Sequence, residues 1–302
     1  MNFSTKLTVA LVSGCLGIAS TALATTLNAK PPTDDAMIFG TSAGADTGNA
    51  NGMGPGMFAG ADGMGNIKRS IVKWDLSSIP TTATLSSVEV DLVIGQIAGS
   101  GGMGSGCGTS CTPPSRTFDF YQVDYTTAWH EGDTGETACP TTGLTKFTQL
   151  CAVIGATGQG WPYASCSGRG VDASCGNDTS WKYIDFTTST QWGNSPSDQD
   201  YGTGSFGSPS FGNHTAAGTW TFNNFLNNNT MAFPADATNN LGFFNVVKDW
   251  VQHPSHNNGL EIRAPGLEGT TTSFIGWWTK DGVNAPSSGL PTSYYPTLTV
   301  NY

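Results

Sequence analysis

The sequence predicts an all-β fold, a two-sheet, jelly-roll-like β-sandwich with one short helix and long, disulfide-bonded, Gly-rich loops. Glycine is abundant, with 40 residues in a chain of 302, and only 11% of the residues are charged. This composition is typical of extracellular β-proteins with long loops. Two long amphipathic segments follow one another between residues 66 and 97, and only residues 241–252 show a helical period. Two half-buried strands in succession favour two packed sheets.

The first of these two strands is centred on residues 69–76. Its apolar side chains alternate with charged ones from Val72 onward, which predicts one buried face and one solvated face. Residues 77–80 end the strand, because Pro80 cannot donate a hydrogen bond to a sheet. The apolar positions are Ile71, Val72, Trp74 and Leu76, and the charged positions are Arg69, Lys73 and Asp75.

The second strand spans residues 85–97, and a third, 117–125, alternates over its whole length. In the second strand, one side is lined by Val88, Val90, Leu92 and Ile94. Shorter strands are expected at 36–39, 57–59, 181–186, 219–222, 259–263, 272–278 and 295–302. The Gly-rich segments between them, chiefly 40–65, 99–115 and 193–217, are predicted to be loops.

The single helical segment is residues 241–252. Phe244, Val247 and Val251 lie at positions i, i+3 and i+7, which places them on one face of a helix. Asn245 is the candidate N-cap, and the His253-Pro254 pair is expected to end the helix.

The first 24 residues predict a secretory signal peptide, which leaves residues 25–302 as one exported domain. Lys6 precedes a mostly apolar stretch, and residues 22–24 offer a small-x-small cleavage site. That stretch is too short to span a bilayer, and no other segment is apolar enough to do so. The alternative is a bacterial lipobox ending at Cys15, which would make the protein a lipid-anchored lipoprotein.

Six of the seven cysteines follow the signal segment, and an even number in an exported chain predicts disulfide bonds. Sequential pairing, 107–111, 139–151 and 166–175, is the simplest of many connectivities. The cysteines define a Cys-rich insertion at about residues 99–180, which lacks sustained periodicity. A zinc site fits their spacing poorly. The six residues are Cys107, Cys111, Cys139, Cys151, Cys166 and Cys175.

The net charge of −10 argues against nucleic acid and anionic membranes as partners. An acidic surface is compatible with calcium, and it is also common in secreted proteins that have no charged partner.

Five motifs occur in a characteristic order. The first comprises Arg69–Asp75, Ser77–Pro80 and Thr84–Val93, and the second is Trp129–Gly132. The third is Val246–Val251 followed by Asn257–Leu260, the fourth is Phe274 in its strand, and the last is Tyr295–Tyr302. This order resembles the DNRLRE-domain family of secreted β-sandwich proteins, which is related to an alginate-binding carbohydrate module. The resemblance covers most of residues 30–302, but the segment 99–180 departs from it. It implies a jelly-roll-like fold and a non-catalytic, glycan-binding or cell-surface role, and it supplies no catalytic residues.

The segment 129–136 carries the densest cluster of functional residue types. Glu131, Asp133 and Glu136 could give oxygens to one calcium ion, because their spacing in a Gly-containing turn lets the carboxylates converge. The alternative is that Trp129 plugs the edge of the sandwich while the acids are solvated turn residues.

Other motifs give weaker indications of chemistry. His253 and His256 would need a third ligand to hold a metal, so they are expected to decorate the end of the helix. Residues 40–44 satisfy G-x-S-x-G, but a Gly-rich loop follows instead of the helix that a nucleophile elbow requires.

Aromatic residues are the candidates for ligand binding. The apolar faces of sugars stack on aromatic rings, and polar groups fix their orientation. Trp161 and Trp192 lie in polar, Gly-rich segments, whereas Trp277 and Trp278 are adjacent in a strand and must point to opposite faces. One of that pair is expected in the core and the other outward. The candidate ligand-binding residues are Trp161, Tyr163, Trp192 and Trp277.

Three functions fit these observations. The leading hypothesis is a secreted, non-catalytic protein that binds polysaccharide or a cell-surface glycan, with a structural calcium ion as the candidate cofactor. A structural subunit of an extracellular matrix or surface fibre, which self-associates through sheet edges, is the alternative. The third is a polysaccharide lyase or glycosidase, which would need paired carboxylates such as Glu131 and Glu136 to face a cleft.

Overall fold

The computed structural model describes residues 25–29, 31–41, 46–51, 56–61, 66–98, 115–123, 128–129, 131, 171–172, 183–185, 190–191, 216–223, 225, 229–268, 273–284 and 289–302. Cys15 and the six predicted disulfide cysteines lie outside these residues, as does the signal segment. Within the described residues, no helix has the length and the apolar character needed to cross a membrane.

The described chain is built mainly of antiparallel strands, which confirms the predicted all-β, sandwich-like fold. The strands are β1 (Thr26–Ala29), β2 (Asp34–Thr41), β3 (Asp46–Asn51), β4 (Gly56–Ala61), β5 (Asn66–Lys73), β6 (Ser87–Ala98), β7 (Arg116–Gln122), β8 (Val171–Asp172), β9 (Tyr183–Asp185), β10 (Thr190–Gln191), β11 (Gly218–Phe222), β12 (Thr230–Asp236), β13 (Leu260–Arg263), β14 (Ser273–Trp278) and β15 (Thr297–Asn301). The helices are α2 (Leu241–Gln252) and α3 (Lys280–Asn284), with 3₁₀ turns η5 (Pro254–His256), η6 (Pro265–Leu267) and η7 (Thr292–Tyr294).

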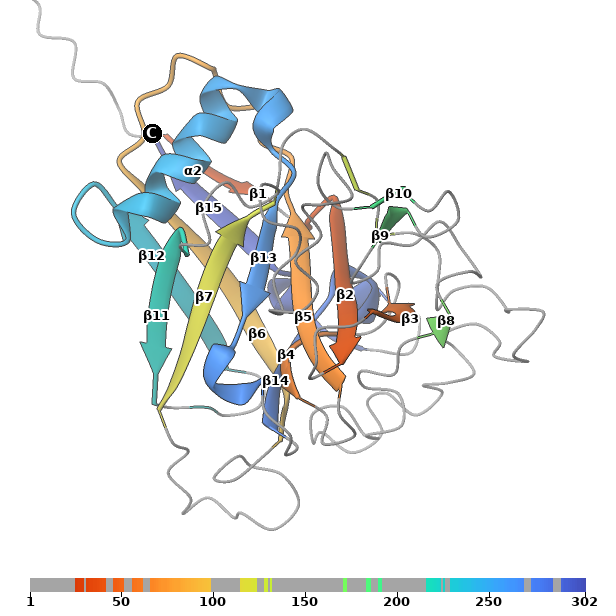
Figure 1. Ribbon diagram of the computed structural model, residues 1–302. Helices are drawn as coiled ribbons and strands as arrows, with labels where there is room; N and C mark the ends of the chain where they lie inside the picture. The colour runs from red at the N-terminus through yellow and green to blue at the C-terminus, as the bar shows by residue number, and fades with distance from the viewer. Residues whose placement is uncertain are drawn as a thin grey trace, which may run out of the picture.

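The strands form two layers (Figure 1). The front layer has the order β2-β5-β13-β7-β11, and behind it β12 and β15 pair with opposite edges of the long strand β6. Strands β14 and β4 carry the hydrogen bonding from β6 back to β5, so the two layers are joined along one side.

The main hydrophobic core fills the space between the layers. Alternate residues of β6 point into it, as the sequence predicts, and they meet aromatic residues of β7 and the buried face of α2. Phe120 is central, with its ring centroid 4.7 Å from those of both Trp220 and Phe233. Core residues include Val88, Val90, Leu92, Ile94, Phe118, Phe120, Phe233, Val247, Leu260, Ile262 and Leu298.

Strand β5 differs from the expectation of one wet face. Val72 points into the main core, but Ile71, on the opposite face, is also fully buried. It packs in a second cluster with Trp129 and Val123, which follow β7 and lie over the outer side of the front layer. Both faces of β5 are therefore buried, because a segment distant in sequence covers the second one.

Helix α2 has the predicted bounds, but the predicted cap is wrong. Asn240 occupies the N-cap position in a left-handed conformation with φ of 48°, and its carbonyl accepts the N–H of Phe244. Its side chain instead accepts the backbone N–H of Thr219 on β11, at 3.2 Å. Asn245 lies inside the helix and is exposed. The helix ends at His253-Pro254, as expected.

Candidate functional site

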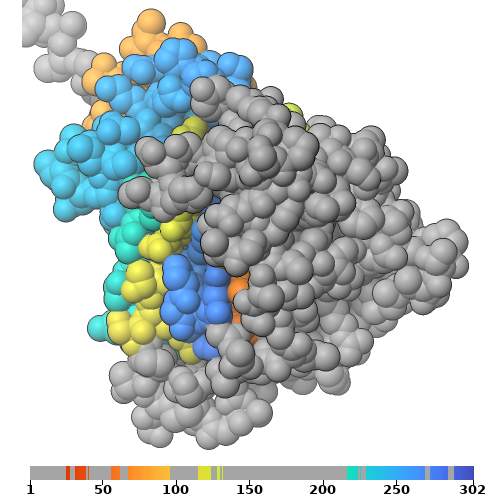
Figure 2. Space-filling model, viewed as in Figure 1, coloured from red at the N-terminus to blue at the C-terminus, as the bar shows by residue number. Residues whose placement is uncertain are grey.

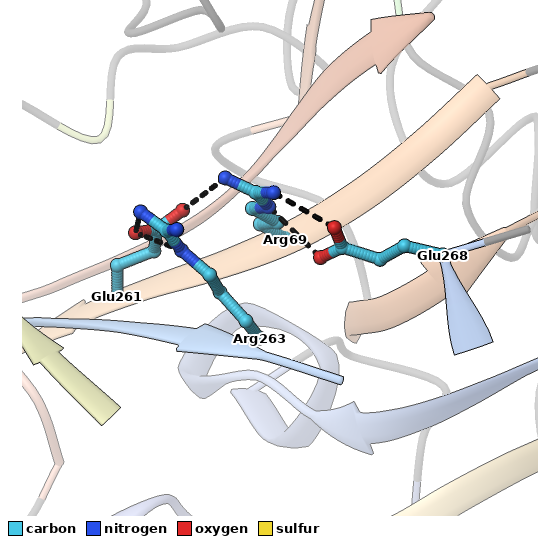
Figure 3. A network of polar contacts seen from close by, with 4 residues as sticks. All are labelled: Arg69, Glu261, Arg263 and Glu268. Carbon is cyan, nitrogen blue, oxygen red and sulfur yellow. Dashed lines mark hydrogen bonds and ion pairs between the residues drawn. The ribbon is translucent and has the colours of Figure 1, made fainter. Parts of the chain in front are cut away.

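The outer side of the front layer carries charged residues that are buried. Arg69 on β5 and Glu261 and Arg263 on β13 all point away from the main core, because their neighbours in the strand, such as Ile262, point into it. Glu268, just after η6, completes the group. Figure 3 shows these four side chains in one network.

The geometry of this network is bidentate at both arginines. Arg69 donates to Glu268 at 2.9 Å (Nε to Oε1) and 2.7 Å (Nη2 to Oε2), and it reaches Oε1 of Glu261 at 3.3 Å. Arg263 donates to Oε2 of Glu261 from Nε at 2.7 Å and from Nη2 at 2.6 Å. Two guanidinium groups thus balance two carboxylates, which is the arrangement a buried ion network requires.

Arg69 keeps its charge although it is buried. Burial alone disfavours the guanidinium, but the charges and hydrogen bonds of Glu261 and Glu268 outweigh it and raise the pKa of Arg69. The charged Arg69 thus links Glu261 on β13 to Glu268 after η6 and ties β5 to both on the outer face of the sheet.

A row of polar residues on β7 and β11 lies beside this network. Figure 2 shows parts of these two strands and of β13 at the surface. The guanidinium of Arg263 lies 4.0 Å from the ring centroid of Tyr121, a cation–π contact. Side chains also bond across the strand pair, Thr219 Oγ1 to Asp119 Oδ1 at 2.7 Å and Thr117 to Thr221 at 2.9 Å. We call Thr117, Asp119, Tyr121, Thr219, Thr221 and Arg263 the polar sheet face.

The polar sheet face is partly accessible. Its three threonines are exposed, and Asp119 and Tyr121 are half-buried. Hydroxyl, carboxylate and phenol groups are therefore presented on the outer side of an antiparallel strand pair. Hydrogen bonds hold the threonines and Asp119, and the contact with Arg263 holds the ring of Tyr121. Such a surface can donate to and accept from a hydroxyl-rich ligand without first ordering its side chains.

A second group of functional residues lies at the other edge of the front layer. Asp35 on β2, Glu131 and Asp281 on α3 bring one carboxylate oxygen each within 4.8 Å of the others. Lys280 donates its ammonium to Glu131 Oε2 at 2.6 Å and to the carbonyl oxygen of Thr33 at 3.1 Å. The backbone N–H of Asp35 donates to Glu131 Oε2 at 3.1 Å. The backbone N–H of Lys280 donates to Asp35 Oδ2 at 2.9 Å. We call the three acids the carboxylate cluster.

The electrostatics of the carboxylate cluster favour protonation in the absence of a cation. Burial, followed by the charge of Asp281, raises the pKa of Asp35 to about 7. Burial, the charge of Asp35 and a hydrogen bond with Asp281 raise the pKa of Glu131 well above its ordinary range. Burial opposes the ammonium of Lys280, yet its bond to Glu131 raises the pKa of Lys280.

A third group occupies the C-terminal end of α2. Asp249 accepts from both imidazoles, His253 Nδ1 at 2.9 Å and His256 Nδ1 at 2.8 Å, and the two rings stack with centroids 5.0 Å apart. The sequence left the two histidines without a third partner, and the structure supplies Asp249. All three side chains are at least partly exposed, so this group also suits a capping role at the helix end.

The structure corrects two expectations about site residues. Trp277 is fully buried in the main core, and its indole N–H points at Sδ of Met231, 3.3 Å away, so it offers no face to a ligand. Trp278 is not outward either, because it packs in another buried cluster on the opposite side of β14. Glu131 is 7% exposed, which excludes the alternative that it is a solvated turn residue.

Several predicted site residues lie outside the part of the chain that the structure describes. They are Asp133 and Glu136 of the expected calcium turn, and the aromatic residues Trp161, Tyr163 and Trp192. Glu131 is brought together with Asp35 and Asp281 instead, two residues that the sequence did not single out. The local sequence signal for this pair is weak, since Asp35 lies at the start of β2 and Asp281 just after the end of β14.

Searches with this sequence match no protein-family model and no curated protein.

Proposed function

We propose that this protein is an exported, non-catalytic β-sandwich that binds a polysaccharide or a cell-surface glycan. The polar sheet face is the observation that carries the proposal. The resemblance to the DNRLRE-domain family is in keeping with it.

The chemistry of the polar sheet face suits a sugar chain. Sugars present hydroxyl groups and apolar C–H faces, which pair with fixed polar groups and with aromatic rings. Asp119, Thr219 and Thr221 supply fixed acceptors and donors, and Tyr121 supplies a half-buried ring held by Arg263. Little side-chain entropy is lost on binding, because these rotamers are already held.

Charge narrows the class of glycan. The chain carries a net charge of −10, so a polyanionic glycan would be repelled at long range. We therefore propose a neutral, hydroxyl-rich polysaccharide as the preferred ligand.

A glycan-array screen of the secreted protein, with and without EDTA, tests this function. A neutral polysaccharide is expected to bind, and Tyr121→Ala and Thr221→Val are expected to weaken that binding. Leu241→Ala is the matched control, because Leu241 is the exposed large apolar residue at the start of α2, on another element. A glycan that binds both face variants as tightly as it binds the native protein would contradict the proposed surface.

The loop tryptophans are tested in the same screen. Trp161→Ala and Trp192→Ala would weaken binding if these rings form the stacking platform expected from the sequence. Loss in these variants alone, with Tyr121→Ala unaffected, would move the binding site away from the polar sheet face.

A matrix or fibre subunit is the second candidate. Among the described strands, β11 ends one layer, and β12 pairs only with β6, so each has an edge at which a further strand could add. A blank glycan array together with concentration-dependent assembly, seen by electron microscopy, would favour this candidate. Turnover of a bound glycan would instead favour the lyase or glycosidase alternative.

A further inference from the structure

Three segments that are far apart in sequence meet at the carboxylate cluster. Asp35 comes from β2, Glu131 from the segment after β7, and Asp281 from α3. One carboxylate oxygen from each lies within 4.8 Å of the other two. Calcium–oxygen distances are about 2.3–2.6 Å, so ligands on opposite sides of one ion are separated by about this span. A single ion can therefore reach all three.

Two oxygens in the cluster have no hydrogen-bond partner although they are buried. They are Oδ1 of Asp35 and Oδ2 of Asp281. Asp35 is 0% exposed, so water does not solvate its free oxygen from outside. A buried carboxylate oxygen without a partner is costly, and it is the atom that a cation would bind. Lys280 and the N–H of Asp35 both use Oε2 of Glu131, so neither of them occupies its Oε1. The hydrogen bond between Glu131 and Asp281 needs a shared proton, which a cation bound by both carboxylates would replace.

The charges in the cluster point to a divalent ion. A bound cation would require the three carboxylates to be ionised, and together with the single ammonium of Lys280 they would then carry a net charge of minus two in a largely buried space. One divalent cation neutralises this charge, whereas a monovalent ion would leave it half-balanced.

We propose that Asp35, Glu131 and Asp281 bind one calcium ion, with Lys280 as the charge-balancing neighbour. All the ligands are hard oxygen atoms, which favours calcium or magnesium over zinc. Magnesium retains most of its water, and two of these three acids are buried, so calcium fits better. The half-buried Asp281 marks the side on which water completes the coordination. This site does not depend on the proposed glycan-binding function.

The proposed ion would act as a structural staple. It would join the first residues of β2, the segment that contains Trp129, and the N-terminus of α3. The sequence predicted a calcium site in the turn that contains Glu131. In the proposed site Glu131 is still a ligand, but its partners are Asp35, 96 positions upstream, and Asp281, 150 positions downstream.

Calorimetric titration of the full chain tests this site, after EDTA treatment and dialysis into metal-free buffer. Calcium chloride is expected to bind with one ion per chain, and the melting temperature should rise with the logarithm of the calcium concentration. Magnesium chloride should bind at least about tenfold more weakly. Asp281→Asn, which keeps the side-chain shape at a half-buried position, should weaken calcium binding by about tenfold or more.

Asp249→Asn is the matched control, because it removes a carboxylate from a second group of the described residues that could hold a metal, and it should leave calcium binding unchanged. Circular dichroism of each metal-free variant checks that it folds, and Glu131→Gln replaces Asp281→Asn if the latter does not. No calcium heat and no thermal shift in the native chain would overturn the proposal. Unchanged calcium affinity in both cluster variants would overturn it as well, and the acids would then be a proton-sharing network.

Discussion

The indole N–H of Trp129 donates a 2.6 Å hydrogen bond to the carbonyl oxygen of Asn258. Trp129 is 1% exposed and Asn258 is 4% exposed, so this bond is buried. It ties the segment after β7 to the turn before β13, and Glu131 of the carboxylate cluster follows two residues later. The bond thus positions both the cover of β5 and one wall of the cluster.

Trp129→Phe should destabilise the protein by about 1–2 kcal/mol, because the phenyl ring fills most of the space of the indole while the buried hydrogen bond is lost. Trp129→Ala should cost more, about 3–5 kcal/mol, because it also leaves a cavity. Urea unfolding followed by circular dichroism measures both. Equal losses in the two variants would show that the hydrogen bond, and not the packing of the ring, is the main contribution.

Arg69→Met should destabilise the protein by about 3–5 kcal/mol, because it leaves Glu261 and Glu268 without their shared cation in a buried site. Adding Glu268→Gln should recover part of that loss, since one uncompensated carboxylate is removed. The free energies of unfolding of the two single variants and the double variant give the coupling. Additive losses would contradict the direct interaction.

Local periodicity was enough to predict the elements whose apolar residues repeat in the sequence. Strand β6 and helix α2 were predicted nearly to the residue, because Val88 to Ile94 alternate and Phe244 to Val251 follow a helical face. Strand β12 was missed because Pro234 interrupts its pattern. Pro234 is exposed, and β6 is the one partner of its strand among the described strands, so a missing donor is tolerated there.

The polar sites could not be predicted from local patterns, because their partners are distant. Arg69 reaches Glu268 across 199 positions, and Lys280 binds Asp35 across 245. Each of these charged residues taken alone indicates a solvated surface position. Only tertiary contacts turn them into a balanced network at one place and a carboxylate cluster at the other.

Trp277→Ala should destabilise the protein by about 3–5 kcal/mol, as expected for the loss of a fully buried indole. The ring lies 5.6 Å from that of Phe118 in an edge-on arrangement, so Trp277→Phe should cost less. Thermal or urea unfolding gives both values. Trp277→Phe should leave the affinity for any glycan found on the array unchanged, and a specific loss of binding without loss of stability would return Trp277 to the ligand site.

Asp236 gives a prediction for acid pH. Its carboxylate accepts hydrogen bonds from the hydroxyl and N–H of Thr238, both at 2.6 Å, and from the N–H of Asn239 at 2.8 Å. These bonds, those from Thr238 first, lower the pKa of Asp236 below its ordinary value of 3.8.

Because the pKa of Asp236 is lower in the folded protein than in the unfolded chain, its stabilising effect is present above the ordinary pKa and is lost as the pH falls through the folded pKa. The native protein should therefore exceed Asp236→Asn in urea midpoint at neutral pH, and the gap should close progressively below about pH 4. Thr238→Val removes one of the donors, so the carboxylate of that variant should titrate at a higher pH in an NMR titration. A gap between the native protein and Asp236→Asn that stays constant down to about pH 2 would show that the carboxylate charge is not what the turn recognises.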